Sequence, residues 1–188
     1  MEKTIGILGG MGPEATLDLF GKIIAGTPAT RDQEHLRVVI DSNPKVPDRT
    51  AAILGHGESP VPVMAAGIRA LQAAGADFVV IPCVSAHAFI DELKGSGLPL
   101  LSMFDAVADH IRKRHPAVRT VGLLGTTGTL RAGRFAAVLD RATHRVRAHE
   151  LVEELLAGSR VLPQFLPPMK LLNCADHGHG GLHGKIHG

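Results

Sequence analysis

Short apolar runs rich in branched side chains alternate with segments of helical periodicity along most of the chain. Such runs are typical of buried parallel strands, and the segments between them of amphipathic helices that cover a sheet. The sequence therefore predicts an α/β fold with parallel sheets flanked by helices. The predicted strands are residues 4–8, 36–40, 78–81, 98–101 and 120–124, and the predicted helices are residues 14–25, 64–74, 86–93, 104–114 and 133–140.

The first and last of these strands resemble each other. The segment TIGILGG begins at Thr4 and the segment TVGLLGT begins at Thr120, 116 residues later. Two strands that end in the same glycine-rich turn predict two similar lobes whose strand ends face one cleft. We expect a first lobe over residues 1–102, a partial second lobe over 103–160 and an irregular Pro/His/Gly-rich tail over 161–188. A chance echo of ordinary strand-then-glycine chemistry is the alternative.

Composition excludes several classes of function. The chain has 188 residues, no Trp or Tyr and a net charge of only +2, which disfavours nucleic acid as a partner. No apolar stretch reaches the roughly 20 residues that span a bilayer, so we expect no membrane association. The N-terminus lacks the pattern of a signal peptide, and we expect a cytoplasmic protein. A small-molecule partner fits these observations best.

Glycines follow the first predicted strand in the segment GGMGPEAT, residues 9–16. Open backbone N–H groups at a helix start can hold a carboxylate or phosphate. The subset Gly10, Gly12 and Ala15 also satisfies a dinucleotide-binding pattern, with Asp41 as the acid that would hold a ribose. Because Asp41 lies a little too far along the chain, nicotinamide binding is a minor alternative. An ordinary strand-to-helix turn is another.

Two polar loops follow other predicted strands. In the loop 41–50, Asn43 can both donate and accept hydrogen bonds, and Arg49 can grip a carboxylate in a bidentate fork. The segment GTTGT, residues 125–129, offers three hydroxyls and open amides as a carboxylate or phosphate cradle. The alternatives are a proline-bounded surface connection for the first loop and a helix cap for the second. Histidines in the Gly-rich tail are weak evidence for a metal site, and we expect none.

Cys83 ends the third predicted strand and begins a predicted helix, in the segment PCVSAH. The positive end of a helix there would favour the thiolate, which is the reactive form of cysteine. Ser85 and His87 follow closely, able to donate to a substrate or to orient the thiol. A buried structural cysteine is the alternative, and so is a core histidine at His87. The position at a strand's carboxyl end favours a catalytic thiol.

Four ordered motifs together resemble the aspartate/glutamate racemase family. They are GILGGMGPEAT (6–16), SNPKVPDRT (42–50), AGADFVVIPCVSAH (74–87) and VGLLGTTGT (121–129). The resemblance implies a cofactor-independent amino-acid racemase of two α/β lobes, with a site between the lobes and one catalytic cysteine from each. It also suggests a homodimer. One thiolate would remove the α-proton while the other thiol returns a proton on the opposite face.

The resemblance also implies roles for particular positions. Cys83 corresponds to the first-lobe acid/base and Ser85 to a retained, substrate-binding hydroxyl beside it. The other positions are implied to contact the substrate, and they are Met11, Gly12, Asn43, Arg49, Thr126, Thr127, Gly128 and Thr129.

The chain departs from the family pattern in two places. The family block is usually Pro-Cys-Asn-Thr-Ala-His, whereas Val84 stands here in place of the amide. The 116-residue offset applied to Cys83 leads to position 199, beyond residue 188, and Cys174 lacks the expected strand before it. We therefore expect a truncated or replaced C-terminal end and leave the second base unassigned.

The sequence thus predicts an amino-acid racemase of the aspartate or glutamate class that uses Cys83 on a small acidic amino acid without a cofactor. A one-cysteine decarboxylase or isomerase is one alternative. A catalytically impaired homologue that binds dicarboxylates is the other.

Overall fold

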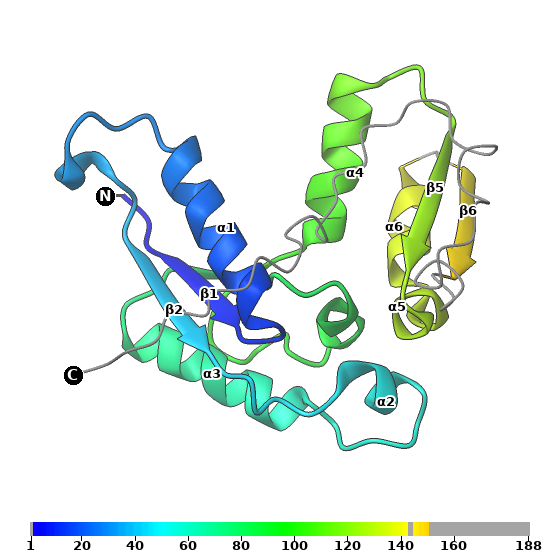
Figure 1. Cartoon of the computed structure of the whole chain (residues 1–188), viewed down its shortest axis with the longest axis horizontal. Helices are drawn as coiled ribbons and strands as arrows, with labels where there is room; N and C mark the ends of the chain where they lie inside the picture. Colours follow the sequence, from blue (N-terminus) through cyan, green and yellow to red (C-terminus); the bar gives the residue numbers. More distant parts are fainter. Residues whose placement is uncertain (1, 143–144, 151–188) are drawn as a thin grey trace, which may run out of the picture.

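The computed structural model describes residues 2–142 and 145–150. Within these residues, two parallel sheets stand apart, joined by a long helix (Figure 1). The first sheet has the strand order β2-β1-β3-β4 and the second pairs β5 with β6. The strands are β1 (Ile5–Gly9), β2 (Val38–Ser42), β3 (Phe78–Val80), β4 (Leu100–Leu101), β5 (Thr120–Gly125) and β6 (Arg145–Glu150).

Helices α1 and α3 lie on opposite faces of the first sheet, because the chain crosses first from β1 to β2 and then back past β1 to β3 (Figure 1). Helix α4 leads to the second sheet, where α5 and α6 follow β5. The helices are α1 (Pro13–Gly26), α2 (Arg49–Ile53), α3 (Val61–Ala73), α4 (Met103–Arg114), α5 (Thr127–Ala132) and α6 (Arg134–Arg141), with 3-10 turns η1 (Asp32–Glu34) and η2 (Ser85–Phe89).

In both sheets the last residue of the first strand pairs with the last residue of the second. Gly9 at the end of β1 pairs with Ser42 at the end of β2, and Gly125 at the end of β5 pairs with Glu150 at the end of β6. The echo between the two strand sequences therefore reflects a repeated strand–turn–helix–strand unit. The predicted α/β architecture with parallel sheets and flanking helices is confirmed.

Local sequence explains several boundaries. Pro13 stands at the first turn of α1, where its missing N–H costs nothing. The Ser102 hydroxyl caps α4 by accepting from the Asp105 N–H at 3.3 Å. Three basic residues in the last turn of α4 interact favourably with the negative end of the helix dipole.

One predicted helix, residues 86–93, is wrong. The structure has only the 3-10 turn η2 there, followed by further turns. The reason lies in His87: its ring Nδ1 bonds to the Cys83 carbonyl at 2.8 Å, the carbonyl to which the His87 N–H would donate in an α-helix. The His87 N–H donates instead to Val84 O at 3.1 Å, which closes a tighter turn.

Smaller differences affect other elements. Strand β2 begins and ends two residues later than predicted, and β4 has only two residues. Strand β6 and the short helices α2 and α5 were not predicted, and the tail 161–188 lies outside the described residues.

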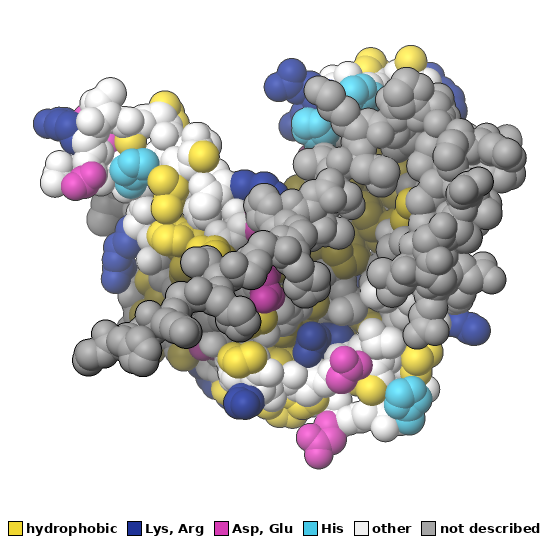
Figure 2. Space-filling view, in the orientation of Figure 1, with side chains coloured by type: hydrophobic (Ala, Val, Ile, Leu, Met, Phe, Trp, Pro, Cys, Tyr) yellow, Lys and Arg dark blue, Asp and Glu magenta, His cyan; other side chains and the backbone are white. Residues whose placement is uncertain are grey.

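The core of the first lobe lies between α3 and the sheet. Ile68 and Leu71 of α3 pack there with Val79 of β3, all at most 1% exposed. The other face is less covered: on α1, Leu17 is 72% and Ile24 44% exposed. Figure 2 shows hydrophobic side chains gathered around α1 on this face. No helix among the described residues has the length and apolar character needed to cross a membrane.

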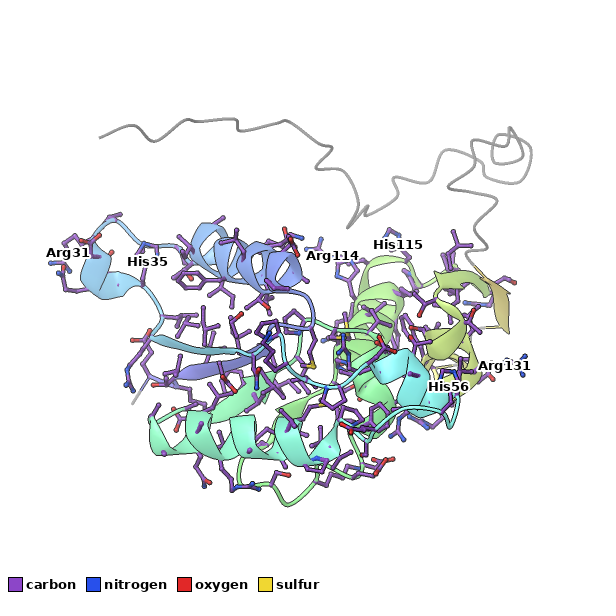
Figure 3. The ribbon with its side chains drawn as sticks, turned by 60° about the horizontal axis from the view of Figure 1, so that its bottom comes forward. Arg31, His35, His56, Arg114, His115 and Arg131 are labelled. Carbon is purple, nitrogen blue, oxygen red and sulfur yellow. The ribbon has the colours of Figure 1, made fainter. Side chains whose placement is uncertain are left out.

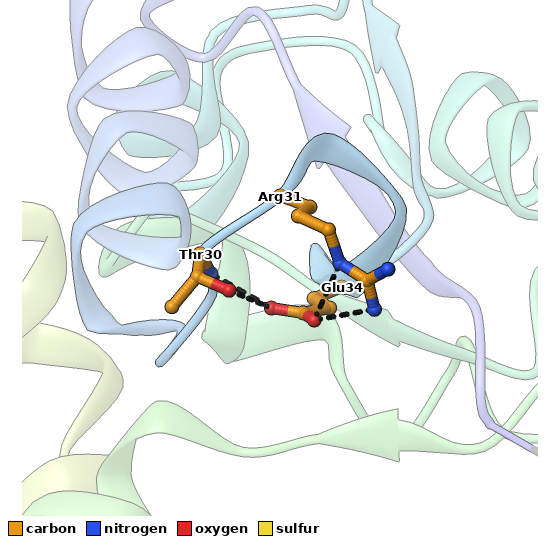
Figure 4. A network of polar contacts seen from close by, with 3 residues as sticks. All are labelled: Thr30, Arg31 and Glu34. Carbon is orange, nitrogen blue, oxygen red and sulfur yellow. Dashed lines mark hydrogen bonds and ion pairs between the residues drawn. The ribbon is translucent and has the colours of Figure 1, made fainter.

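A polar turn closes the amino-terminal edge of the first sheet. Glu34 accepts from the Thr30 N–H at 2.7 Å and from Arg31 Nη2 at 2.8 Å (Figure 4). These bonds, led by the one from Thr30, lower the pKa of Glu34 to about 2. Figure 3 shows Arg31 and His35 at the end of the molecule opposite His56 and Arg131, so this turn lies away from the carboxyl ends of the strands.

Candidate active site

Thr16 holds the glycine-rich loop after β1 in shape. The Gly10 N–H donates to Thr16 Oγ1 at 2.9 Å, and the Thr16 hydroxyl donates to the Gly12 carbonyl at 3.1 Å. Gly10 has a φ of +85°, and its Cα faces the main chain of Asn43 so closely that a side chain would overlap with it. The predicted anion loop therefore lies directly against the predicted substrate loop. Met11 between them is 6% exposed.

The loop after β2 is ordered by its own polar side chains. Asn43 Oδ1 accepts from the Lys45 N–H at 3.0 Å. The Arg49 side chain turns back on the same loop, where Nη1 donates to Val46 O at 3.1 Å and to Pro47 O at 2.9 Å. Arg49 Nε is buried and has no hydrogen-bond partner among the described residues. One side of the predicted carboxylate clamp is thus occupied by main-chain carbonyls, while Nε leaves an unsatisfied donor.

Cys83 lies beyond the carboxyl end of β3 and is 8% exposed. Its Sγ is 3.5 Å from Ser85 Oγ, and either atom can donate. The predicted neighbour of the thiol is therefore in contact with it. Because η2 has only five residues, it aligns fewer peptide dipoles behind Cys83 than the predicted helix would, and the helix argument for the thiolate is weaker than the sequence suggests.

His87 is fully buried and uses both ring nitrogens. The Met103 N–H donates to Nε2 at 3.1 Å, so Nε2 carries no proton and Nδ1–H donates to the Cys83 carbonyl at 2.8 Å. This tautomer is assigned from the hydrogen bonds. Burial is the main cause of a lowered pKa for His87, and the ring is therefore neutral at neutral pH.

The loop after β5 belongs to the second sheet but touches the first lobe. Thr126 caps α5, where Oγ1 accepts from the Thr129 N–H at 3.4 Å and lies 3.1 Å from Thr129 Oγ1. Gly128 faces α2 closely: a Cβ there would lie 2.8 Å from Thr50 Oγ1. The hydroxyls of Thr126 and Thr129 thus serve as a cap, while Thr127, half-buried, opens the first turn of α5.

The ends of β1, β2 and β3 converge on one buried cluster that includes Met11, Val46 and Cys83. Helix α5 contacts both α2 and η2, so the loop after β5 joins the same group. Figure 3 shows His56, just after α2, and Arg131 of α5 at one end of the molecule. The structure therefore brings the four predicted loops together. Cys174 and the tail histidines lie outside the described residues.

Other features do not join this group. The Asp41 carboxylate lies against Gly67 of α3, which gives no support to a ribose-binding role. A recess of about 970 Å³ lies between the segment 90–105 and α6, and Cys83 does not line it. The described residues contain no cluster of His, Cys, Asp or Glu suited to a metal ion.

Sequence reasoning overlooked Thr16 and Met103. Thr16 could have been found from its place four residues after Gly12, where a hydroxyl reaches back to a carbonyl one turn earlier. Met103 contributes only its main-chain N–H, which no residue type reveals.

The fold and the placement of Cys83 define an α/β protein with a thiol at the carboxyl end of a parallel strand, beside a glycine-rich loop. The profile of the Asp/Glu/hydantoin racemase family matches residues 8–164. The chain belongs to this family.

Individual relatives agree with this assignment. The chain is 27% identical over 164 residues to the broad specificity amino-acid racemase RacX of Bacillus subtilis (strain 168), covering 81% of this chain and 69% of RacX. The aspartate racemase of Picrophilus torridus superposes with a TM-score of 0.70 at 32% identity, covering 78% of this chain. An aspartate racemase homologue from Pyrococcus horikoshii OT3 gives 0.65 at 28% identity, covering 82% of this chain and 68% of its own length. The chain spans 62% of the Picrophilus protein.

Proposed function

We propose that this chain is a cofactor-independent amino-acid racemase of the aspartate or glutamate class, with Cys83 as one acid/base. The observation that carries the proposal is the position of Cys83, whose thiol lies 3.5 Å from the Ser85 hydroxyl where the loops after β1, β2 and β5 meet. Similarity to RacX and to the Picrophilus aspartate racemase supports the same reaction class.

In the proposed reaction, the Cys83 thiolate takes the α-proton of the amino acid. The S–H bond forms as the Cα–H bond breaks, and the electron pair moves into the adjacent carboxylate. A proton from a second acid on the opposite face then closes the reaction. Among the described residues Cys83 is the one free cysteine, and we therefore leave the second acid unassigned.

Fixed donors must hold the charge that develops on the carboxylate. We assign the carboxylate to the cradle of Thr126, Thr127, Gly128 and Thr129, and the reacting carbon to the loop of Met11 and Gly12. We assign Asn43 and Arg49, whose buried Nε has no hydrogen-bond partner among the described residues, to the second carboxylate of an acidic substrate.

Exchange of the α-hydrogen with solvent deuterium tests the proposal. Each pure enantiomer of aspartate and of glutamate is incubated in D₂O with the whole chain and followed by proton NMR and by optical rotation. We expect exchange with both enantiomers and loss of rotation. In Cys83→Ala the loss of rotation should disappear, together with exchange of the enantiomer whose α-hydrogen faces Cys83. Ser96→Ala, a half-buried position outside the site, is the matched control and should retain full activity.

The other outcomes separate the alternatives. Exchange with a single enantiomer indicates one working base and favours a one-cysteine decarboxylase or isomerase, which carbon dioxide release from a malonate-type acid would identify. Saturable binding of the acids without exchange indicates the dicarboxylate-binding homologue. Unchanged activity in Cys83→Ala contradicts the proposed mechanism.

A further inference from the structure

A continuous chain of contacts runs from Cys83 to the second lobe through His87. The His87 ring is tied to the Cys83 carbonyl on one side and to the Met103 N–H, at the start of α4, on the other. It is 0% exposed, so no water replaces either bond. The His87 ring thus connects the main chain of Cys83 to the first turn of α4 through two hydrogen bonds.

The same ring packs on aromatic neighbours. The centroids of His87 and Phe104 are 4.8 Å apart, with an angle of 39° between the ring planes. Phe104 stacks in turn on Phe135 of α6, at 4.5 Å and 8°. Three rings thus link the Cys83 segment to a helix of the second lobe, at distances typical of favourable ring pairs.

An ion pair fastens the same two regions. Arg134, the neighbour of Phe135, bonds to Asp91, two residues beyond η2, and Lys94 contacts Asp91 at 2.6 Å. Hydrogen bonds from Lys94 and Arg134 lower the pKa of Asp91 to about 2. We call the contacts among Asp91, Phe104, Arg134 and Phe135 the interlobe joint.

We propose that His87 is a positioning residue that fixes the place of the Cys83 thiol according to how α6 docks at the interlobe joint. This inference deepens the proposed function, since it concerns the geometry of the same thiol. Neither ring nitrogen is available to a substrate, so His87 acts through Cys83 and exchanges no proton itself. Disturbing α6 should therefore alter the position of Cys83 through Phe104 and His87.

The test measures the thiol directly. In a Cys174→Ser background, the rate constant for alkylation of Cys83 by iodoacetamide is recorded between pH 6 and 10. Because Cys83 is only 8% exposed, access limits the reaction, and a loosened Cys83 segment should react faster. We expect Phe135→Ala to raise the rate constant by roughly threefold or more, and His87→Leu to raise it further.

Phe20→Ala is the matched control, because Phe20 is also half-buried but lies on α1, away from the chain of rings. It should leave the rate constant unchanged. His87→Asn, which keeps a donor toward the Cys83 carbonyl, should fall between the original protein and His87→Leu. If His87→Leu fails to fold, the alkylation rate constant of Phe135→Ala still tests the inference.

Alkylation needs no substrate, so the result stands whether or not the chain racemises amino acids. Where racemisation is measurable, we expect kcat to fall in Phe135→Ala with KM little changed, opposite in direction to the alkylation rate. Alkylation of Phe135→Ala at the original rate at every pH would overturn the inference, as would an equal increase in Phe20→Ala.

Discussion

The close approach of Gly10 to Asn43 gives the sharpest quantitative prediction. Gly10 has a φ of +85°, and a Cβ would overlap with the main-chain N and C of Asn43. These atoms belong to the main chain directly after β2, where the Asn43 N–H donates to the Gly9 carbonyl, and cannot rotate away as a flexible side chain would. Gly10→Ala should therefore displace the loop that carries Asn43.

The cost can be divided into two parts. A left-handed backbone costs an L-residue about 1–2 kcal/mol, and forcing atoms into a filled space adds about 1–3 kcal/mol. Gly55 has a nearly equal φ of +82° but nothing within 4 Å of its Cβ position, so Gly55→Ala should lose only the first part. The entropy that alanine removes from the unfolded chain is common to both variants and cancels in the comparison.

Urea denaturation followed by circular dichroism measures both free energies of unfolding. We expect Gly10→Ala to lose about 2–5 kcal/mol and Gly55→Ala about 1–2 kcal/mol. Gly10→Ala should also weaken binding of aspartate, whereas Gly55→Ala should not. A difference in stability below about 0.5 kcal/mol between the two variants would refute the close packing of the two loops.

Three further predictions concern the core, the site and pH. Leu139 is 0% exposed, so Leu139→Ala should lower the free energy of unfolding by about 2–5 kcal/mol in a thermal or urea melt. Val84→Asn restores the amide of the usual family block and should raise kcat/KM for an acidic amino acid by roughly tenfold. An unchanged kcat/KM would show that this amide does not contribute to activity. Burial lowers the folded-state pKa of His87 below 6.5, opposed first by the hydrogen bond to the Cys83 carbonyl; Arg134 also lowers this pKa and Asp105 raises it. Near neutral pH the unfolded chain therefore binds a proton at His87 more readily than the folded chain does. The contribution is complete above pH 6.5 and declines as the pH falls toward the folded pKa, with a slope of at most about 1.4 kcal/mol per pH unit that His87→Gln should remove in urea titrations.

Hydrophobic runs and glycine turns sufficed to predict strands β1 to β5, though not β6, because both are local signals. They also placed Cys83 beyond the end of β3, and the loops of Asn43 and Thr126 after β2 and β5. The short turn η2 could not be predicted in this way. The turn depends on the hydrogen bond from the His87 ring to the Cys83 carbonyl. That ring orientation depends in turn on contacts with Met103 and Phe104, which belong to a later helix.

The orientation of Arg49 is a second feature beyond sequence reasoning. A guanidinium in a polar loop at a strand end indicates a carboxylate clamp, yet Nη1 satisfies the carbonyls of Val46 and Pro47. Such side-chain bonds to nearby main chain are set by loop geometry, which residue types alone do not determine.

The stack of Phe104 on Phe135 limits how the two lobes can move. Two nearly parallel rings keep most of their contact when one turns within its own plane, but lose it when one tilts away from the other. The interlobe joint should therefore permit rotation of the second lobe about the axis perpendicular to the two rings and resist a hinge-like separation of the lobes. Fluorophores placed on α1 and α6 should then report a change in relative orientation with little change in separation.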